Sequence, residues 1–166
     1  MITVTDLSKK YGGTLVLQLP ELNIPKGQRF GLVGNNGAGK TTTIAMLTGL
    51  IPVDSGNAVI EGYDINENMH EIRQNLGVCP QHDILFDFMT VKEHLVFYGK
   101  LKANMSGKEL KRDIANMMTK VGLNQYSDDY VSALSGGLRR RLEVAIAFVS
   151  GSKTVILDEP TSGVDP

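Results

Sequence analysis

The chain has 166 residues, and 42% hydrophobic and 21% charged residues are the ordinary composition of a single globular domain. Its 17 Lys and Arg residues nearly balance its 18 Asp and Glu residues, and the net charge of -1 excludes the overall basic character of a nucleic-acid-binding protein. The apolar runs, such as residues 144–149, are far too short to span a bilayer.

The first 24 residues contain an alternating pattern. Apolar residues alternate with polar ones at 2–7 and again at 15–19, on either side of the turn sequence Tyr11-Gly12-Gly13. This pattern predicts two antiparallel strands joined by a turn. The Tyr11 ring has two equally supported interpretations: it stacks on a nucleobase, or it packs on its own hairpin. The first 13 residues lack the layout of a signal peptide, so the sequence gives no indication of secretion.

Residues 34–41, GNNGAGKT, fit the phosphate-loop pattern G-x-x-x-x-G-K-[ST]. We expect a buried strand at 30–33 before the loop and a helix at 42–50 after it. The loop amides and the helix N-terminus then surround an anion, Lys40 reaches the β- and γ-phosphates, and the Thr41 hydroxyl binds Mg²⁺. A glycine-rich turn that binds nothing is the alternative, and the correct offsets of Lys40 and Thr41 disfavour it. The motif predicts a nucleoside triphosphate.

The next segment predicts a short strand at 58–61, a helix at 68–75 and a buried strand at 76–79 that ends at Pro80. The single cysteine, Cys79, lies in the last of these strands and is interpreted as a small buried hydrophobic residue. Gln81 follows directly, where a polar side chain can face a site formed at the strand ends.

Two capping boxes predict two helices in the middle of the chain. One begins at Thr90 with Glu93, and the other begins at Ser106 with Glu109. An apolar stripe follows the second box, at Leu110, Ile114, Met117, Met118 and Val121. Its two methionines are interpreted as core filling. Because these helices interrupt the alternation of strands and helices, we expect a helical insertion in an α/β core.

Residues 134–137, LSGG, precede a further predicted helix with Ser135 as its cap. Gly136 and Gly137 leave free amides at the helix entrance that can hold an anion, although the pattern alone is not specific. Residues 139–141 are three consecutive arginines, and we expect them to form a solvated helix face.

An apolar strand is predicted at 153–158, and it ends in two acids, Asp158 and Glu159. In a phosphate-loop protein, an acid at this place holds the Mg²⁺ shell and a second acid polarises the attacking water. We assign the first role to Asp158 and the second to Glu159, and we expect both to face the ion held by the loop. The alternative is an acidic turn without a catalytic role.

These motifs together resemble the nucleotide-binding domain of ATP-binding cassette (ABC) proteins, over essentially the whole chain. The segments that carry the resemblance are the phosphate loop, Gln81, LSGG at 134–137, ILDEP at 156–160 and SGVDP at 162–166. LSGG is the discriminating segment, because other phosphate-loop NTPases lack it. From about residue 50 onward the sequence looks like the A subfamily, the lipid-exporting branch.

The resemblance implies a set of site residues. Tyr11 would stack on adenine, and the phosphates would lie on Gly34, Asn35, Asn36, Gly37, Ala38, Gly39, Lys40, Thr41 and Thr42. Mg²⁺ would be held by Thr41, Gln81 and Asp158, and the residues of catalysis would be Glu159 as general base, Lys40 and Gln81. Ser135, Gly136 and Gly137 would complete the ATP site of a second cassette, and Asp165 would lie across the dimer interface.

The resemblance also implies the architecture and the partners. The fold is expected to be α/β, a phosphate-loop NTPase core with a mainly parallel sheet, N-terminal antiparallel strands and a helical insertion. Residues 1–80 and 153–166 would form the core, and about 82–150 the helical subdomain with the signature motif. A second ABC ATPase domain would pair head to tail with this one. Transmembrane domains of a lipid exporter would place it at the cytoplasmic face of a membrane.

The family's switch histidine follows SGVDP, and the three histidines here, His70, His82 and His94, all precede it. The sequence is therefore expected to be an ABC domain truncated after residue 166, with little turnover alone. The alternative to an ATPase domain is a module that binds nucleotide with little turnover, and this alternative stays open. A soluble cassette protein that acts on ribosomes or nucleic acid is disfavoured by the single cassette and the net charge.

Overall fold

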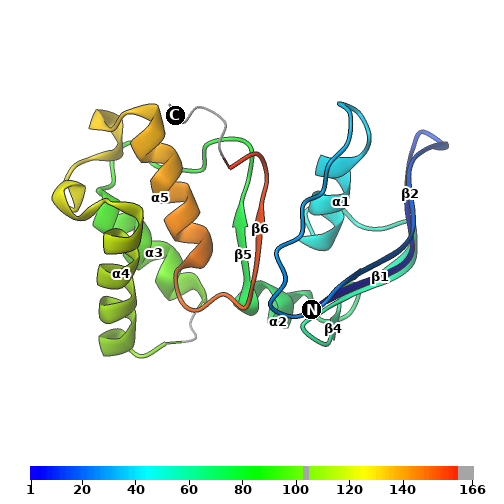
Figure 1. Ribbon diagram of the computed structural model, residues 1–166, viewed down its shortest axis with the longest axis horizontal. Coiled ribbons are helices and arrows are strands. Elements are labelled where there is room, and N and C mark those ends of the chain that lie inside the picture. Colours follow the sequence, from blue (N-terminus) through cyan, green and yellow to red (C-terminus); the bar gives the residue numbers. More distant parts are fainter. Residues whose placement is uncertain (103–104, 161–166) are drawn as a thin grey trace. The chain divides into compact units, whose positions relative to one another are not determined.

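A computed structural model describes residues 1–102 and 105–160. The chain divides into two compact units, Met1–Arg73 and Gln74–Pro166 (Figure 1). The helices and strands are β1 (Ile2–Tyr11), β2 (Thr14–Ile24), α1 (Lys40–Leu47), β3 (Ser55–Ile60), β4 (Tyr63–Asp64), α2 (Met69–Asn75), β5 (Leu76–Cys79), α3 (Val91–Lys102), α4 (Gly107–Val121), α5 (Gly136–Phe148) and β6 (Thr154–Leu157). Two short 3₁₀ helices, Asn124–Tyr126 and Val131–Ala133, lie between α4 and α5.

The first unit is built on an antiparallel sheet of strand order β2-β1-β3-β4. The predicted pairing of the two N-terminal strands is confirmed, with Ile2 opposite Ile24 and a shift of register between Lys9 and Lys10. Every second residue of a strand faces the same side, so Ile2 and Val4 of β1 share one buried face. The register of β1 against β3 shifts between Thr5 and Ser8, and Leu7, which lies within this shift, is buried as well. The core of this unit consists of Ile2, Val4, Leu7, Met46, Leu47, Ala58, Ile60, Ile65 and Ile72.

The prediction of a buried strand at 30–33 is wrong. These residues form no strand, and Phe30, Leu32 and Val33 are 50%, 42% and 92% exposed. A strand is held by backbone hydrogen bonds to a neighbour, and the four strands of this unit pair only with one another. An apolar run is therefore not sufficient to make a strand at this position.

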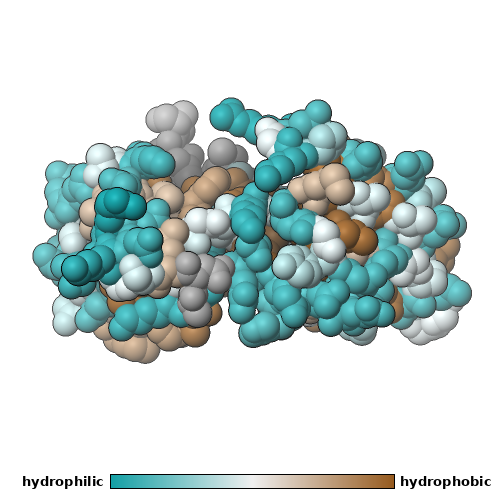
Figure 2. All heavy atoms as spheres, turned by 90° about the horizontal axis from the view of Figure 1, so that it is seen from below, coloured by the Kyte–Doolittle hydropathy of each residue, from teal (hydrophilic) through white to brown (hydrophobic). Residues whose placement is uncertain are grey.

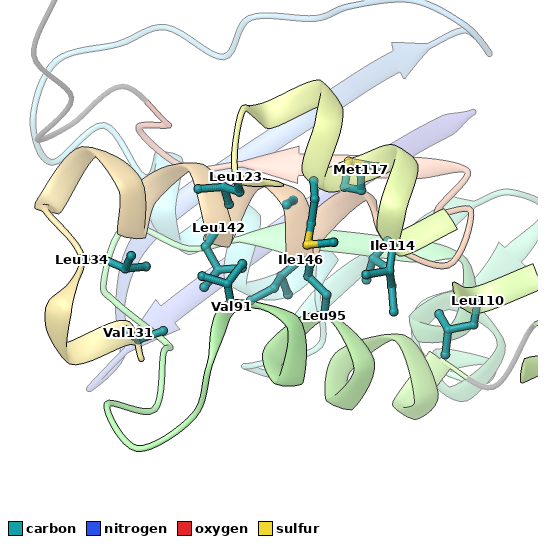
Figure 3. Close-up of a cluster of buried hydrophobic side chains, with 13 residues drawn as sticks. Val91, Leu95, Leu110, Ile114, Met117, Leu123, Val131, Leu134, Leu142 and Ile146 are labelled. Carbon is teal, nitrogen blue, oxygen red and sulfur yellow. The ribbon is translucent and has the colours of Figure 1, made fainter. Parts of the chain in front are cut away.

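The second unit contains a parallel pair of strands and three long helices. Strand β5 pairs with β6 from Leu76 opposite Thr154 to Cys79 opposite Leu157. Because the pair is parallel, the segments after Cys79 and after Leu157 emerge at the same edge. The helices and the two 3₁₀ turns enclose one hydrophobic core (Figure 3) of Val91, Leu95, Leu110, Ile114, Met117, Met118, Leu123, Val131, Leu134, Leu142, Ala145, Ile146 and Val149. Met117 and Met118 are core filling, as predicted.

Both predicted capping boxes are present. The Thr90 amide and hydroxyl donate to the Glu93 carboxylate, and the Glu93 amide donates back to the Thr90 hydroxyl. Ser106 and Glu109 make the same reciprocal pair at the start of α4. The side chains thereby satisfy helix amides that lack partners within the helix. At its other end α4 stops at Gly122, whose φ of 71° is left-handed.

None of the described helices is long and apolar enough to cross a membrane. Hydrophilic residues predominate on the face drawn in Figure 2, with hydrophobic residues scattered among them. This mixture is normal for a folded surface, where single exposed apolar side chains are common.

We expect Gly77→Ala to destabilise the second unit strongly. A Cβ atom at Gly77 of β5 would lie 1.7 Å from the carbonyl oxygen of Ala147 in α5, so the helix backbone would have to move. Overpacking of this kind costs about 1–3 kcal/mol. Thermal unfolding would measure it, with Gly107→Ala as control, because a Cβ there meets nothing within 4 Å. Equal melting temperatures for the two variants would contradict the close approach of β5 and α5.

Candidate functional site

The predicted phosphate loop leads directly into helix α1, which begins at Lys40. Gly37 and Gly39 have φ values of 83° and 86°, a left-handed backbone that glycine adopts without strain. Gly39 is the residue before the helix, and the first turn of α1 contains no acidic side chain. The unpaired amides at this helix start therefore keep their partial positive charge for an external anion.

The Lys40 ammonium folds back over its own loop. Its Nζ donates to the carbonyl oxygens of Gly34 at 2.6 Å and Asn35 at 2.9 Å. None of the ion pairs among the described residues involves Lys40, so no carboxylate neutralises it there. A half-buried cation with no carboxylate partner, at the start of a helix, is a suitable receptor for phosphate.

The three threonines after Lys40 have different surroundings. Thr43 is buried, and its hydroxyl donates to the Gly39 carbonyl at 2.9 Å, which fixes the start of α1. Thr42 is half-buried, whereas Thr41 is exposed. The Thr41 hydroxyl makes no side-chain hydrogen bond with the described residues and is thus free to bind a ligand.

Tyr11 lies at the end of β1, and its side chain is exposed. The Lys9 ammonium is 5.7 Å from the centre of its ring, and the same ammonium donates to the Pro52 carbonyl and to Asp54. The ring therefore has a neighbour on its own hairpin and also a free surface, and stacking on adenine stays a prediction.

At the carboxyl edge of β5 and β6, the structure brings together Gln81 and Glu159. The Gln81 amide Nε2 donates to Glu159 Oε2 at 3.2 Å, and the Asp158 amide donates to the Cys79 carbonyl at 2.8 Å. Glu159 has a φ of 47°, an uncommon left-handed conformation for a residue with a side chain. Such strained residues cluster at functional sites, where the surrounding structure holds them in place.

The predicted magnesium ligands are divided between the units, with Thr41 in the first and Gln81 and Asp158 in the second. Within the described residues, no group of three or more His, Cys, Asp and Glu side chains is arranged to hold a metal ion. Hydroxyl, amide and carboxylate oxygens are the donors that Mg²⁺ prefers, together with water and substrate phosphates. It stays a prediction that Asp158 and Glu159 face the magnesium ion held by the phosphate loop.

The prediction that residues 139–141 form a solvated helix face is wrong for Arg140. Arg140 is buried and pairs with Glu143 at 2.7 Å. Arg139 pairs with Asp83 at 2.6 Å and with Asp87 at 2.9 Å. The sequence did contain one signal for the buried pair, because Arg140 and Glu143 have opposite charges at helix positions i and i+3.

The segment between Gln81 and α3 is anchored from several sides. The Ile84 amide donates to Glu143, and the Ile84 carbonyl accepts from the Tyr98 hydroxyl. Burial opposes ionisation of Asp83, yet hydrogen bonds from the Leu85 amide and from Arg139 lower its pKa. The segment that carries Gln81 is thus held by charged and polar groups as well as by packing.

A buried histidine takes part in this anchoring. His94 Nε2 accepts from the Phe86 amide at 2.9 Å, while Nδ1 faces the Thr90 carbonyl at 2.8 Å. This pattern requires the neutral ring with its proton on Nδ1. Burial lowers the pKa of His94, and Arg139 acts in the same direction, whereas the hydrogen bond to the Thr90 carbonyl and the charges of Asp83 and Glu93 oppose it.

We expect acid to weaken the fold through His94. The unfolded chain binds the histidine proton near the ordinary pKa of about 6.5, whereas the folded chain binds it only at lower pH. The contribution of neutral His94 to the unfolding free energy is therefore fully present above the unfolded-state pKa, and it is lost as the pH falls below that pKa. Between about pH 7.5 and about pH 5.5 the melting temperature should fall further for the wild type than for His94→Gln. If the melting temperatures of the wild type and His94→Gln fell equally with pH, His94 would not be the group that weakens the fold in acid.

The predicted signature residues lie at the start of α5. The Ser135 side chain accepts from the Leu138 amide, as expected of a cap, and Gly136 and Gly137 form the first turn. Ser135 and Gly136 are exposed. An exposed helix start with a small side chain and two glycines leaves room for a bound group to approach the backbone.

A protein-family model described as "ABC transporter" matches residues 17–162. The chain belongs to the ABC transporter family. A solved structure titled "Structure of ATP binding subunit of ABC transporter" superimposes with a TM-score of 0.90 at 28% identity, over 99% of this chain and 68% of that one. The predicted fold class, an α/β phosphate-loop NTPase with N-terminal antiparallel strands, is confirmed.

Several curated members of the A subfamily resemble this ABC domain. It is 49% identical to human "ATP-binding cassette sub-family A member 2" over 100% of this chain. It is 52% identical to human "Phospholipid-transporting ATPase ABCA3" over 87% of the chain, and 42% identical to human "Glucosylceramide transporter ABCA12" over 99%. The chain spans only 7%, 8% and 6% of these relatives. The predicted likeness to the A subfamily is confirmed.

Proposed function

We propose that this chain is the ATP-binding and ATP-hydrolysing domain of a membrane transporter that moves lipid. The observation that carries the proposal is a phosphate loop with a lysine that pairs with no described carboxylate, in a chain of the ABC transporter family. Lipid as the transported class is supported by the names of two relatives, a phospholipid-transporting ATPase and a glucosylceramide transporter.

In the proposed reaction, residues 34–42 bind the triphosphate through backbone amides and Lys40, and Tyr11 stacks on the adenine. Thr41, Gln81 and Asp158 supply oxygen ligands that fit Mg²⁺. Magnesium, when bound, neutralises charge on the phosphate oxygens. Glu159 accepts a proton from the attacking water, and its contact with Gln81 orients the carboxylate.

The proposed partners are a second ABC ATPase domain and the transmembrane domains of the transporter, at the cytoplasmic face of a membrane. The exposed start of α5 supports the first partner, because Ser135, Gly136 and Gly137 offer a hydroxyl and backbone amides to a phosphate bound elsewhere. We further propose that about 82–150 is the helical subdomain and that 1–80 with 153–166 is the core.

Phosphate release from ATP tests the proposal. The chain is mixed with a partner cassette domain whose own general base has been replaced, and a single turnover is followed with the protein in excess over ATP. We expect release that requires magnesium. If ATP binds but no phosphate is released with the partner present, the chain is a nucleotide-binding module and the hydrolytic part of the proposal fails.

A further inference from the structure

Arg140 makes an unusually large set of contacts for a helix arginine. Its guanidinium donates to four backbone carbonyls, those of Pro80 at 2.7 Å, Asp158 at 2.7 Å, Glu159 at 2.8 Å and Pro160 at 3.3 Å. The same group pairs with the buried Glu143 carboxylate at 2.7 Å. These contacts occupy all three guanidinium nitrogens, so Arg140 is fixed in one orientation.

The acceptors of Arg140 lie at the ends of two strands. The Pro80 carbonyl directly precedes Gln81 at the end of β5, and the carbonyls of Asp158 and Glu159 follow β6. A single rigid, planar group thus bridges the two segments whose side chains, Gln81 and Glu159, meet at 3.2 Å. Only arginine has this fork of donors, because the lysine ammonium is a single point.

Glu143 extends the same arrangement to the segment after Gln81. Its second carboxylate oxygen accepts from the Ile84 amide at 3.2 Å, while the first accepts from Arg140. Gln81 is therefore flanked on both sides by backbone held from α5, at Pro80 and at Ile84. The left-handed φ of Glu159 requires such support, since its backbone is strained.

We propose that Arg140 is a positioning residue for ATP hydrolysis, which holds the Gln81 side chain and the Glu159 carboxylate in reactive geometry by fixing the backbone that carries them. This inference depends on the proposed function. In the proposed reaction Arg140 touches neither nucleotide phosphate nor water, and it acts through Gln81 and Glu159. Its loss should therefore slow the chemical step and leave ATP affinity unchanged.

The test uses two variants and two controls in the single-turnover assay. Arg140→Lys keeps the charge opposite Glu143 but not the fork, and Arg140→Met with Glu143→Met removes both buried charges. We expect each to lower the rate about 100-fold, as a misplacement of about 1 Å does, with ATP affinity within about twofold. Arg141→Lys and Arg141→Met are the controls, because Arg141 makes no hydrogen bond or ion pair with the described residues. They should retain the wild-type rate.

A double-mutant cycle separates positioning from general loss of structure. If Arg140 acts through Gln81, Arg140→Lys combined with Gln81→Ala is no slower than the slower single variant, because both disrupt one unit. If the rate reductions of Arg140→Lys and Gln81→Ala multiplied in the double variant, the inference would be overturned. A wild-type rate in Arg140→Lys, or in the double methionine variant should Arg140→Lys fail to fold, would overturn it as well. Absence of hydrolysis by the wild type would instead refute the proposed function and this inference with it.

Discussion

Glu159→Gln is expected to abolish phosphate release while ATP binding persists. General-base catalysis contributes about 100-fold to 10,000-fold to a rate, and an amide cannot accept the proton of the attacking water. The replacement preserves the size of the side chain and an oxygen that can accept from Gln81, whose amide contacts the carboxylate at 3.2 Å. Binding should persist because the phosphates are assigned to Lys40 and its loop.

Single-turnover release of phosphate and equilibrium binding of ATP, measured on the same samples, check this prediction. Glu67→Gln is a matched control, because Glu67 is exposed on the surface of the first unit. It should release phosphate at the wild-type rate. If Glu159→Gln also did so, Glu159 would not be the general base.

Lys40→Ala is expected to remove most of the affinity for ATP. The ammonium lies over the loop, 2.6 Å and 2.9 Å from two of its carbonyls, and no carboxylate among the described residues shares its charge. A hydrogen bond to a charged group contributes about 1.5–3 kcal/mol, which corresponds to about 10-fold to 150-fold in the dissociation constant. The loop also loses the contacts that shape it.

Fluorescence titration with an ATP analogue measures this effect. Lys26→Ala is the control, because Lys26 is an exposed lysine outside the loop in the same unit. Its affinity should equal that of the wild type. If Lys40→Ala bound as tightly, the phosphates would not lie on this loop.

Local sequence signals predicted the elements whose ends are set by a few neighbouring residues. The strand Leu76–Cys79 has the predicted bounds, because the apolar run is followed by Pro80, which cannot continue a ladder. Ser106 and Ser135 cap α4 and α5 as predicted, since a cap is a contact between residues three apart. Such features need no knowledge of distant parts of the chain.

Features that depend on distant neighbours were not predicted. The run at 30–33 is apolar, but the sequence does not state whether a strand is available to pair with it. Arg140 lies in a run of charges, and the four backbone carbonyls that accept hydrogen bonds from its guanidinium are 18 to 60 residues away. The left-handed backbone of Glu159 likewise has no local signal, and its carbonyl accepts from Arg140 of α5, 19 residues away.

Equilibrium binding of magnesium-ATP to the folded chain, measured by titration calorimetry, tests the central claim most directly. The claim is that the loop around Lys40 holds a triphosphate. It predicts saturable binding of one ATP per chain, with a dissociation constant below about 1 mM, and much weaker binding of AMP, which lacks the β- and γ-phosphates. A folded, monodisperse sample that binds no ATP, or that binds AMP equally well, would contradict it.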